Sequence, residues 1–317
     1  MDPGTFSGEK AAALAELGVT RASVGVQSLD DEQLQRCGRK HTAQEAKEAI
    51  RLLRSVGLEN ISADLLSGLP QQSEEQLVSD LHELVAWGVD HLSVYDLQYE
   101  PGTAFGRRWP VAGETGRPGE AAAAALYETT HWELEKLGFE HYEVSNYARF
   151  TQTLLQGPEG GAAGGVSSRS QHNQIYWHGA PYAAYGNGAA SFVHSIRASR
   201  PRSLESYCRW VEAGGPLEGL ELDTSQRDSR ADALCETTML RLRTMEGLTL
   251  QAEDGETERC LQAIFGALEP WQEAKLASAS FADGSLATPY QYLHNPEEGP
   301  AAEQRGKRGQ GEQMRAG

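Results

Sequence analysis

The stretch that decides the fold lies between residues 42 and 66 and reads TAQEAKEAIRLLRSVGLENISADLL. Its first half predicts an amphipathic helix, because apolar residues recur three or four apart from Ala46 to Val56. Thr42 begins a capping box, and Gly57 stands where a glycine ends a helix. The second half, Asn60 to Leu66, predicts a strand. A helix that leads into a strand in this way indicates an α/β protein.

The same alternation extends over roughly the first third of the chain. Further strands are predicted at 22–27 and 91–97, and further helices at 7–17 and 73–87. Alternating helices and strands imply a parallel sheet with helical crossovers. Three strands are too few to close a barrel, so we expect residues 1–150 to form the C-terminal half of a (β/α) barrel.

The remainder of the chain divides by composition. A helix at 119–137 and a strand or strand end at 141–146 complete the first region. A small, mostly helical C-terminal region is expected to follow the barrel half. The further expected segments are a flexible insertion rich in Gly, Ala, Ser and Gln at 151–170, a compact element at 171–202, the C-terminal domain at 203–293 and a disordered tail at 294–317.

Charge and hydropathy exclude several classes of partner. The net charge is −17, from 28 basic and 45 acidic residues, which argues against nucleic acid or an anionic membrane as the main partner. No apolar run approaches the roughly 20 residues that a transmembrane helix needs. The first residues, Met1 to Gly4, show no targeting leader, so we expect either a protein that stays where it is made or a leader that precedes Met1.

The four cysteines are too far apart in the sequence to form a CxxC or CxxxCxxC cluster. We interpret them as free thiols, and nothing indicates a disulfide scaffold. They are Cys37, Cys208, Cys235 and Cys260.

In parallel α/β proteins, ligands bind at the carboxyl ends of the strands. Polar residues lie in or just after the predicted strands, near these ends. Gln27 ends the first strand, Asp64 lies in the second, Gln98 follows the third, and Arg39 stands twelve residues after Gln27. An amide, a carboxylate and an arginine suit a zwitterionic ligand that carries a ribose. On spacing alone, polar residues that only satisfy turns are the favoured explanation.

A second candidate site is the segment His172-Asn173-Gln174-Ile175-Tyr176-Trp177. The imidazole of His172 can ligate iron, and the rings of Tyr176 and Trp177 can cover a flat macrocycle, whereas His178 is a weaker candidate ligand. A histidine that only packs among aromatic rings is the alternative. The glycines of Gly186-Asn187-Gly188 predict a tight turn, because the third glycine, the following helix and the downstream acid of a dinucleotide-binding motif are missing.

Several motifs, in order, resemble those of radical S-adenosylmethionine (SAM) proteins of the HemN/HemW type. GVTRASVGVQS at 18–28 is similar to their GvnRlSlGvQS segment, and DLLSGLP at 64–70 to their DLIxGLP. The other matching segments are GRKH at 38–41, SVY at 93–95, EPGT at 100–103, YEVSN at 142–146 and HNQIYW at 172–177. The resemblance covers roughly residues 1 to 250, and the segment at 185–202 is similar to plant and algal members.

The resemblance implies roles for the matching residues. Gln27, Arg39, Asp64 and Gln98 align with positions that contact SAM in the family. The HNxxYW motif points to the HemW branch, whose members bind and deliver haem, so His172, Tyr176 and Trp177 are expected to contact haem. Haem or porphyrin, and possible haem-accepting proteins, are the partners that the resemblance implies. The alternative within the family is an oxygen-independent coproporphyrinogen III oxidase.

Departures from the family pattern concern its cofactor loop. Family members hold a [4Fe–4S] cluster with a CxxxCxxC loop, followed by a Gly-Gly segment and a glutamate, and these would precede Met1 here. We therefore expect an N-terminally truncated family member that has no cluster and does not run radical chemistry in this form. An inactive fragment is the third hypothesis. Organelle and cytoplasm both stay open as the location, since a transit peptide would also precede Met1.

Overall fold

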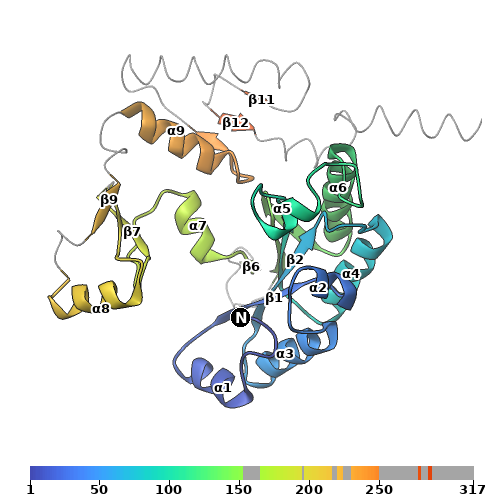
Figure 1. Ribbon diagram of the computed structural model, residues 1–317, viewed down its shortest axis with the longest axis horizontal. Coiled ribbons are helices and arrows are strands. Elements are labelled where there is room, and N and C mark those ends of the chain that lie inside the picture. Colours follow the sequence, from blue (N-terminus) through green and yellow to red (C-terminus); the bar gives the residue numbers. More distant parts are fainter. Residues whose placement is uncertain are drawn as a thin grey trace, which may run out of the picture. The chain divides into compact units, whose positions relative to one another are not determined.

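The computed structural model describes residues 1–152, 165–194, 196–215, 220–223, 230–249, 278–279 and 285–287. The chain forms two compact units, Met1–Arg169 and Ser170–Gly317 (Figure 1). The boundary falls just before the HNxxYW segment. The two candidate sites therefore belong to different units.

The first unit alternates helices with strands along the chain, as the hydrophobic periodicity predicts (Figure 1). Its helices are α1 (Gly8–Glu16), α2 (Asp31–Arg36), α3 (Ala43–Ser55), α4 (Glu74–Ala86), α5 (Ala104–Arg108) and α6 (Glu120–Lys136). Its strands are β1 (Arg21–Gln27), β2 (Asn60–Ser67), β3 (His91–Asp96), β4 (Phe139–Glu143), β5 (Asn146–Gln152) and β6 (Gly165–Ser167). The prediction missed α2 and α5 because so short a helix shows no clear period of apolar residues.

Strands β1, β2 and β3 pair in parallel and in chain order, as predicted. Helices α3 and α4 lie in the crossovers that parallel neighbours require. Strand β5 continues the sheet beside β3 in the antiparallel direction, and it also pairs with β4 and β6. In the described part of the chain these six strands form an open sheet, consistent with half of a barrel.

The stretch 141–146, predicted as a strand or strand end, contains the end of one strand and the start of the next, because the chain reverses inside it. Strand β4 ends at Glu143, and β5 begins at Asn146. The carboxylate of Glu143 accepts hydrogen bonds from the backbone N–H of Ser145, at 2.9 Å, and from the side chain of Asn146. A side chain therefore holds this turn, and no glycine or proline marks it in the sequence.

Side-chain caps set where α3 and α4 begin. Thr42 forms the predicted capping box at the start of α3. Ser73 caps α4 by accepting a hydrogen bond from the backbone N–H of Gln76 at 3.2 Å. Ser73-Glu74-Glu75-Gln76 has the spacing of a capping box, but the box is incomplete, because the side chain of Gln76 donates to Asp80 at 2.6 Å instead of returning to Ser73.

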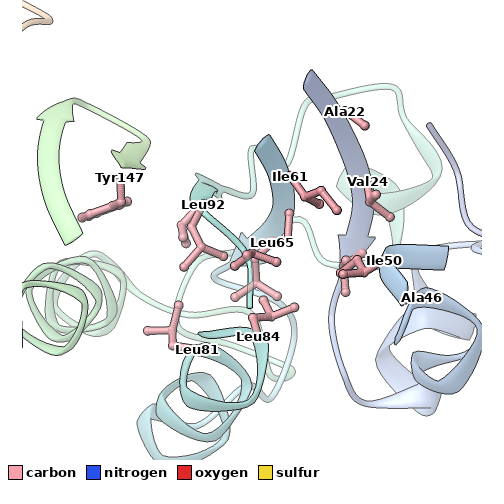
Figure 2. Close-up of a cluster of buried hydrophobic side chains, with 14 of the residues drawn as sticks. Ala22, Val24, Ala46, Ile50, Ile61, Leu65, Leu81, Leu84, Leu92 and Tyr147 are labelled. Carbon is pink, nitrogen blue, oxygen red and sulfur yellow. The ribbon is translucent and has the colours of Figure 1, made fainter. Parts of the chain in front are cut away.

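The core of the first unit lies between the sheet and its helices. Figure 2 shows Val24, Ile61 and Leu65 on the strands directed toward Ile50 of α3 and Leu84 of α4. All five side chains are 0% exposed. Burial of a Leu or Ile side chain stabilises the fold by about 1.5–3 kcal/mol. The helix-covered face of the sheet is therefore the main source of stability in this unit.

The second unit combines helices with short antiparallel strands. Its helices are α7 (Gln171–Trp177), α8 (Leu204–Glu212) and α9 (Arg230–Arg241). Its strands are β7 (Ala190–Val193), β8 (Ile196–Ser199), β9 (Glu221–Asp223), β10 (Leu248–Thr249), β11 (Ser278–Ala279) and β12 (Ser285–Ala287), in two sheets ordered β7-β8-β9 and β10-β12-β11.

Some sequence predictions fall at the edge of the described chain. The ends of the predicted insertion, 151–152 and 165–167, form part of β5 and its partner β6, whereas 153–164 lie outside the described residues. The predicted tail at 294–317 also lies outside them. Gly186 and Gly188 form a turn that leads into β7 and not into a helix, as predicted from the incomplete dinucleotide motif.

Candidate functional site

The parallel strands carry polar side chains on the face opposite the helices. Successive side chains of a strand point to opposite faces, so residues in register across parallel strands share a face. Two such rows run across β1, β2 and β3, one of Ser23, Ser62 and His91, and one of Gly25, Asp64 and Ser93. We call these rows, together with Arg21 at the start of β1, the polar face. In a closed (β/α) barrel, the face opposite the helices is the interior.

Gly25 lies at the centre of three of the four residues predicted to bind SAM. A Cβ atom on Gly25 would lie 3.1 Å from Nε2 of Gln27 and 3.2 Å from Oδ1 of Asp2. The same oxygen accepts a hydrogen bond from Nη1 of Arg39 at 3.1 Å, and Asp64 is the register partner of Gly25. The structure thus gathers Gln27, Arg39 and Asp64 around the buried backbone of Gly25.

Gln27 reaches this place because the end of β1 is irregular. The pairing of β1 with β2 shifts register between Gly25 and Gln27. Gln27 adopts a φ of +70°, in the left-handed region that non-glycine residues rarely occupy, and its side chain is buried. A conformation of this kind costs about 1–3 kcal/mol and is concentrated at functional sites. The strain therefore supports a ligand-binding role for the Gln27 amide.

Serines from both neighbouring strands hold the Asp64 carboxylate. The hydroxyl of Ser23 donates to Oδ1 at 2.8 Å, and the hydroxyl of Ser93 also hydrogen-bonds the carboxylate. Burial raises the pKa of Asp64, although these two hydrogen bonds and the charge of Arg21 oppose the rise. A carboxylate so placed is a fixed acceptor for an amine or a hydroxyl group of a ligand.

Gln98, the fourth predicted residue, lies apart from the other three. It is exposed beyond the end of β3, and its Nε2 donates to Oδ2 of Asp96 at 3.1 Å. The other oxygen of Asp96 lies 2.9 Å from the point where a Cβ on Gly68 would stand. Among the described contacts none joins Gln98 to Gln27, Arg39 or Asp64.

Sequence reasoning missed two polar residues of this face, Arg21 and His91. His91 is 1% exposed, with Nδ1 2.8 Å from the hydroxyl of Ser62 and Nε2 2.8 Å from the hydroxyl of Tyr142. Burial lowers the pKa of His91 well below its ordinary value, so the ring is neutral. The polar residues at 21 and 23, and at 91 and 93, alternate with apolar ones, and this period of two was the available signal.

The HNxxYW segment forms helix α7 in the second unit. His172 is exposed, and the hydroxyl of Tyr176 lies 3.3 Å from its Nε2. The two rings meet edge to face with centroids 5.0 Å apart. Trp177 is half-buried. Tyr176 also lines a cavity of about 480 Å³, where it meets the ring of Tyr182 at 4.5 Å between centroids.

Polar and apolar walls meet in this cavity. Helices α7 and α9 and strands β7 and β8 contribute to it. Phe192 and Met239 supply apolar surface, whereas Arg197 and Glu236 form an ion pair with an N–O distance of 2.7 Å. A cavity of this size, mostly apolar with a few polar groups, suits a small organic ligand.

The parallel sheet, with helices on one face and polar groups on the other, belongs to a partial barrel of the radical SAM type. A model of the radical SAM superfamily matches residues 2–84. The chain also superposes on the coproporphyrinogen III oxidase HemN from Escherichia coli with a TM-score of 0.69, over 92% of this chain and 66% of that chain, at 17% identity. The chain belongs to the radical SAM superfamily, and it has the HemN-like fold.

Sequence relatives place the chain more narrowly. The heme chaperone HemW of Synechocystis is 35% identical over 253 residues, which are 78% of this chain and 56% of the relative. The heme chaperone HemW of Escherichia coli is 34% identical over 77% of this chain and 58% of its own. The mouse mitochondrial radical S-adenosyl methionine domain-containing protein 1 is 32% identical over 95% of this chain and 64% of its own. The chain is a homologue of the HemW proteins.

The chain spans 56–64% of the length of these three relatives. Among the described residues, no helix is long and apolar enough to cross a lipid bilayer. The same residues contain no group of three or more His, Cys, Asp or Glu side chains that could hold a metal ion. Cys37 is half-buried, Cys208 and Cys235 are exposed, and Cys260 lies outside the described residues.

Superfamily membership implies SAM and a [4Fe–4S] cluster as cofactors. The polar face has polar groups of the kind that suit SAM, because the Gln27 amide, the Arg39 guanidinium and the Asp64 carboxylate gather around Gly25. The described thiols do not fit the cluster, since they are not grouped with other metal ligands. We therefore derive no step through a cluster.

Proposed function

We propose that this protein binds haem and passes it to haem-accepting proteins, in the manner that the name of its HemW relatives describes. One structural observation carries the proposal. Helix α7 presents the exposed imidazole of His172, backed by the ring of Tyr176, beside a cavity lined with aromatic side chains. A neutral imidazole is a haem-iron ligand, and flat rings pack against a porphyrin. Trp177, on the same helix, is the further residue proposed to contact the macrocycle.

SAM is the second proposed ligand, on the polar face of the first unit. Gln27, Arg39 and Asp64 would hold it around Gly25, with Gln98 at the end of β3 as an outer contact. The arginine suits a carboxylate, and Asp64 suits an amine or the ribose hydroxyls. When bound, SAM would supply an adenosyl group and a reactive sulfonium to this face. The strained Gln27 backbone supports the assignment.

Porphyrin oxidation of the coproporphyrinogen III oxidase type is the alternative function. The likeness to HemN supports it only as a shared fold, because 17% identity does not carry a substrate or a reaction. The sequence relatives at 34–35% identity are named heme chaperones, which favours haem binding. Haem binding and transfer is therefore the function that we propose first.

Titration with haem tests the role of His172. We expect the purified chain to shift the Soret band with saturation, and His172→Ala to weaken binding by at least about 10-fold, equal to 1.4 kcal/mol. His178→Ala is the matched control, because His178 is also exposed and lies at the end of the same helix. Equal titration curves for wild type and His172→Ala would refute the assignment, as would an equal loss in His178→Ala.

A further inference from the structure

Arg197 of strand β8 brings a positive charge to the cavity of the second unit. Its guanidinium lies over the ring of Phe192, 5.6 Å from the centroid, and its Nη2 donates to Oε1 of Glu236 at 2.7 Å. Tyr182, which also lines the cavity, hydrogen-bonds the guanidinium. The side chain of Arg197 is still 32% exposed, so a ligand in the cavity can reach it.

The rest of the cavity wall suits a flat ring system. The rings of Tyr176 and Tyr182 meet edge to face, and Tyr182 lies 6.0 Å from Phe192 between ring centroids. Helix α9 contributes Met239 and Leu240. Aromatic rings and aliphatic side chains pack against a flat apolar ligand, whereas the guanidinium needs a polar acceptor. A ligand that satisfies both is flat, largely apolar and carries an acceptor at its edge.

The charges in the cavity favour a carboxylate as this acceptor. A guanidinium has five N–H donors in a planar fork that matches the two oxygens of a carboxylate. The described hydrogen bonds of Arg197 go to one oxygen of Glu236 and to Tyr182, so donors remain for a ligand. A phosphate would bring up to two negative charges beside the carboxylate of Glu236, and their repulsion favours a group with a single negative charge.

A chain of contacts joins this arginine to the candidate haem ligand. The hydroxyl of Tyr176 lies 3.3 Å from Nε2 of His172, and the ring of Tyr176 packs against Tyr182. Tyr182 then hydrogen-bonds Arg197. Two aromatic side chains therefore link the imidazole to the guanidinium. In haem, a flat ring system likewise separates the central iron from the propionate carboxylates at its edge.

We propose that Arg197 binds a carboxylate of a flat, largely apolar ligand in this cavity, and that Glu236 competes with that carboxylate for the guanidinium. The inference rests on the proposed function in one respect, because haem transfer makes a porphyrin propionate the source of the carboxylate. The two members of the ion pair then have opposite effects on affinity. The guanidinium attracts the ligand carboxylate, whereas the carboxylate of Glu236 repels it and occupies one donor.

Mesoporphyrin IX and its dimethyl ester test the proposal, because the ester keeps the ring system and lacks the charged carboxylates. Both probes are used without metal, so that His172 forms no bond to iron, and binding is followed by porphyrin fluorescence. Wild type should bind the acid more tightly than the ester. Arg197→Met should weaken binding of the acid by roughly 10- to 100-fold and leave binding of the ester nearly unchanged. Arg197→Lys keeps the charge but not the fork, so it should recover only part of the lost affinity.

Glu236→Gln separates a binding role of the pair from a structural one. The amide keeps an acceptor for Arg197 but removes the negative charge, so the acid should bind about 3- to 10-fold more tightly and the ester as before. If the pair were purely structural, both variants would weaken binding of both probes. Arg209→Met is the matched control, since Arg209 forms an exposed ion pair with Glu205 on α8 at 3.5 Å, and it should bind both probes as wild type does.

Three results would overturn the proposal. They are failure of wild type to bind the acid more tightly than the ester, an equal change for both probes in Arg197→Met, and weaker binding of the acid by Glu236→Gln. The haem titration of His172→Ala gives a separate answer, because it depends on iron and these probes contain none. If haem binding does not depend on His172 while acid and ester still differ through Arg197, the carboxylate site stands and the proposed iron ligand fails. A Soret shift that depends on His172, without a preference for the acid, has the opposite meaning.

Discussion

The two faces of the β1–β3 sheet bury different kinds of side chain, apolar ones on the helix-covered face and polar ones on the polar face. On the helix-covered face, Val24, Leu65 and Leu92 are 0% exposed and pack in the core with α3 and α4 (Figure 2). On the polar face, the hydroxyl of Ser23 donates a hydrogen bond to the carboxylate of Asp64. Apolar burial needs no directed partner, whereas each buried polar group must recover the hydrogen bonds that it made with water.

This difference separates stability from recognition within one sheet. Hydrogen bonds between neighbouring strands satisfy Ser23 with Asp64 and Ser62 with His91. On the same face two buried donors of Arg21 have no hydrogen-bond acceptor, and Gln27 adopts a φ of +70°. The helix-covered face therefore holds the fold together, whereas the polar face carries costs of strain and of unsatisfied donors.

The largest expected effect on stability comes from a substitution on the helix-covered face. Leu65→Ala should lower the free energy of unfolding by about 3 kcal/mol, because the removed atoms leave a cavity in the core. Leu66→Ala is the matched control, since Leu66 is the next residue of β2, is half-buried and points to the opposite face, and we expect a cost of about 1 kcal/mol or less. Urea unfolding measures both. Equal costs would contradict the contrast between the faces.

A smaller effect comes from His91 and depends on pH. The folded state keeps this ring neutral because burial lowers its pKa well below 6.5, whereas the unfolded chain takes up a proton near that pH. Its contribution is therefore fully present above pH 6.5 and is lost as the pH falls, by at most about 1.4 kcal/mol per pH unit.

Urea unfolding at pH 7.5 and pH 5.5 tests this dependence. Between these two values wild type should lose more stability than His91→Gln, whose amide does not titrate. His178→Gln replaces an exposed histidine and should follow wild type. A His91→Gln variant with the same pH dependence as wild type would show that this buried imidazole does not set the slope.

The smallest effect on stability should accompany a clear effect on binding. Gly25→Ala places a methyl group 3.1 Å from Nε2 of Gln27 and 3.2 Å from Oδ1 of Asp2, so these side chains must shift by a few tenths of an ångström. We expect the free energy of unfolding to change by less than about 0.5 kcal/mol. Replacing a glycine in a strand is stabilising, and this effect should offset the destabilising effect of the crowding. Binding of 5′-methylthioadenosine, which shares the adenosine part of SAM, should weaken by about 10-fold.

A matched variant tests whether the loss of binding comes from crowding at this site or from any glycine-to-alanine substitution. Gly8→Ala adds the same atom on α1, near Leu52, and should leave binding unchanged. If Gly25→Ala binds methylthioadenosine as wild type does, then Gly25 does not mark the point where the ligand approaches.

Much of the first unit was predictable from local patterns. The helix from Ala43 to Ser55 shows its period and its cap in the sequence, and Gln27 and Asp64 stand in recognisable motifs at or near strand ends. The reversal after Glu143 was not predictable, because a side chain and not a glycine or proline holds it. The second candidate site was predicted as a motif, but its helix and its cavity were not.

The sequence by itself determined the strands, the capped helices and the residue types available for a ligand, because these depend on neighbours a few positions apart. Only the tertiary structure decided which polar groups lose water and which find partners. Ser23 and Asp64 meet across 41 residues of sequence, whereas two buried donors of Arg21 find no acceptor. Such outcomes depend on how strands align in space, which no local pattern of side chains specifies.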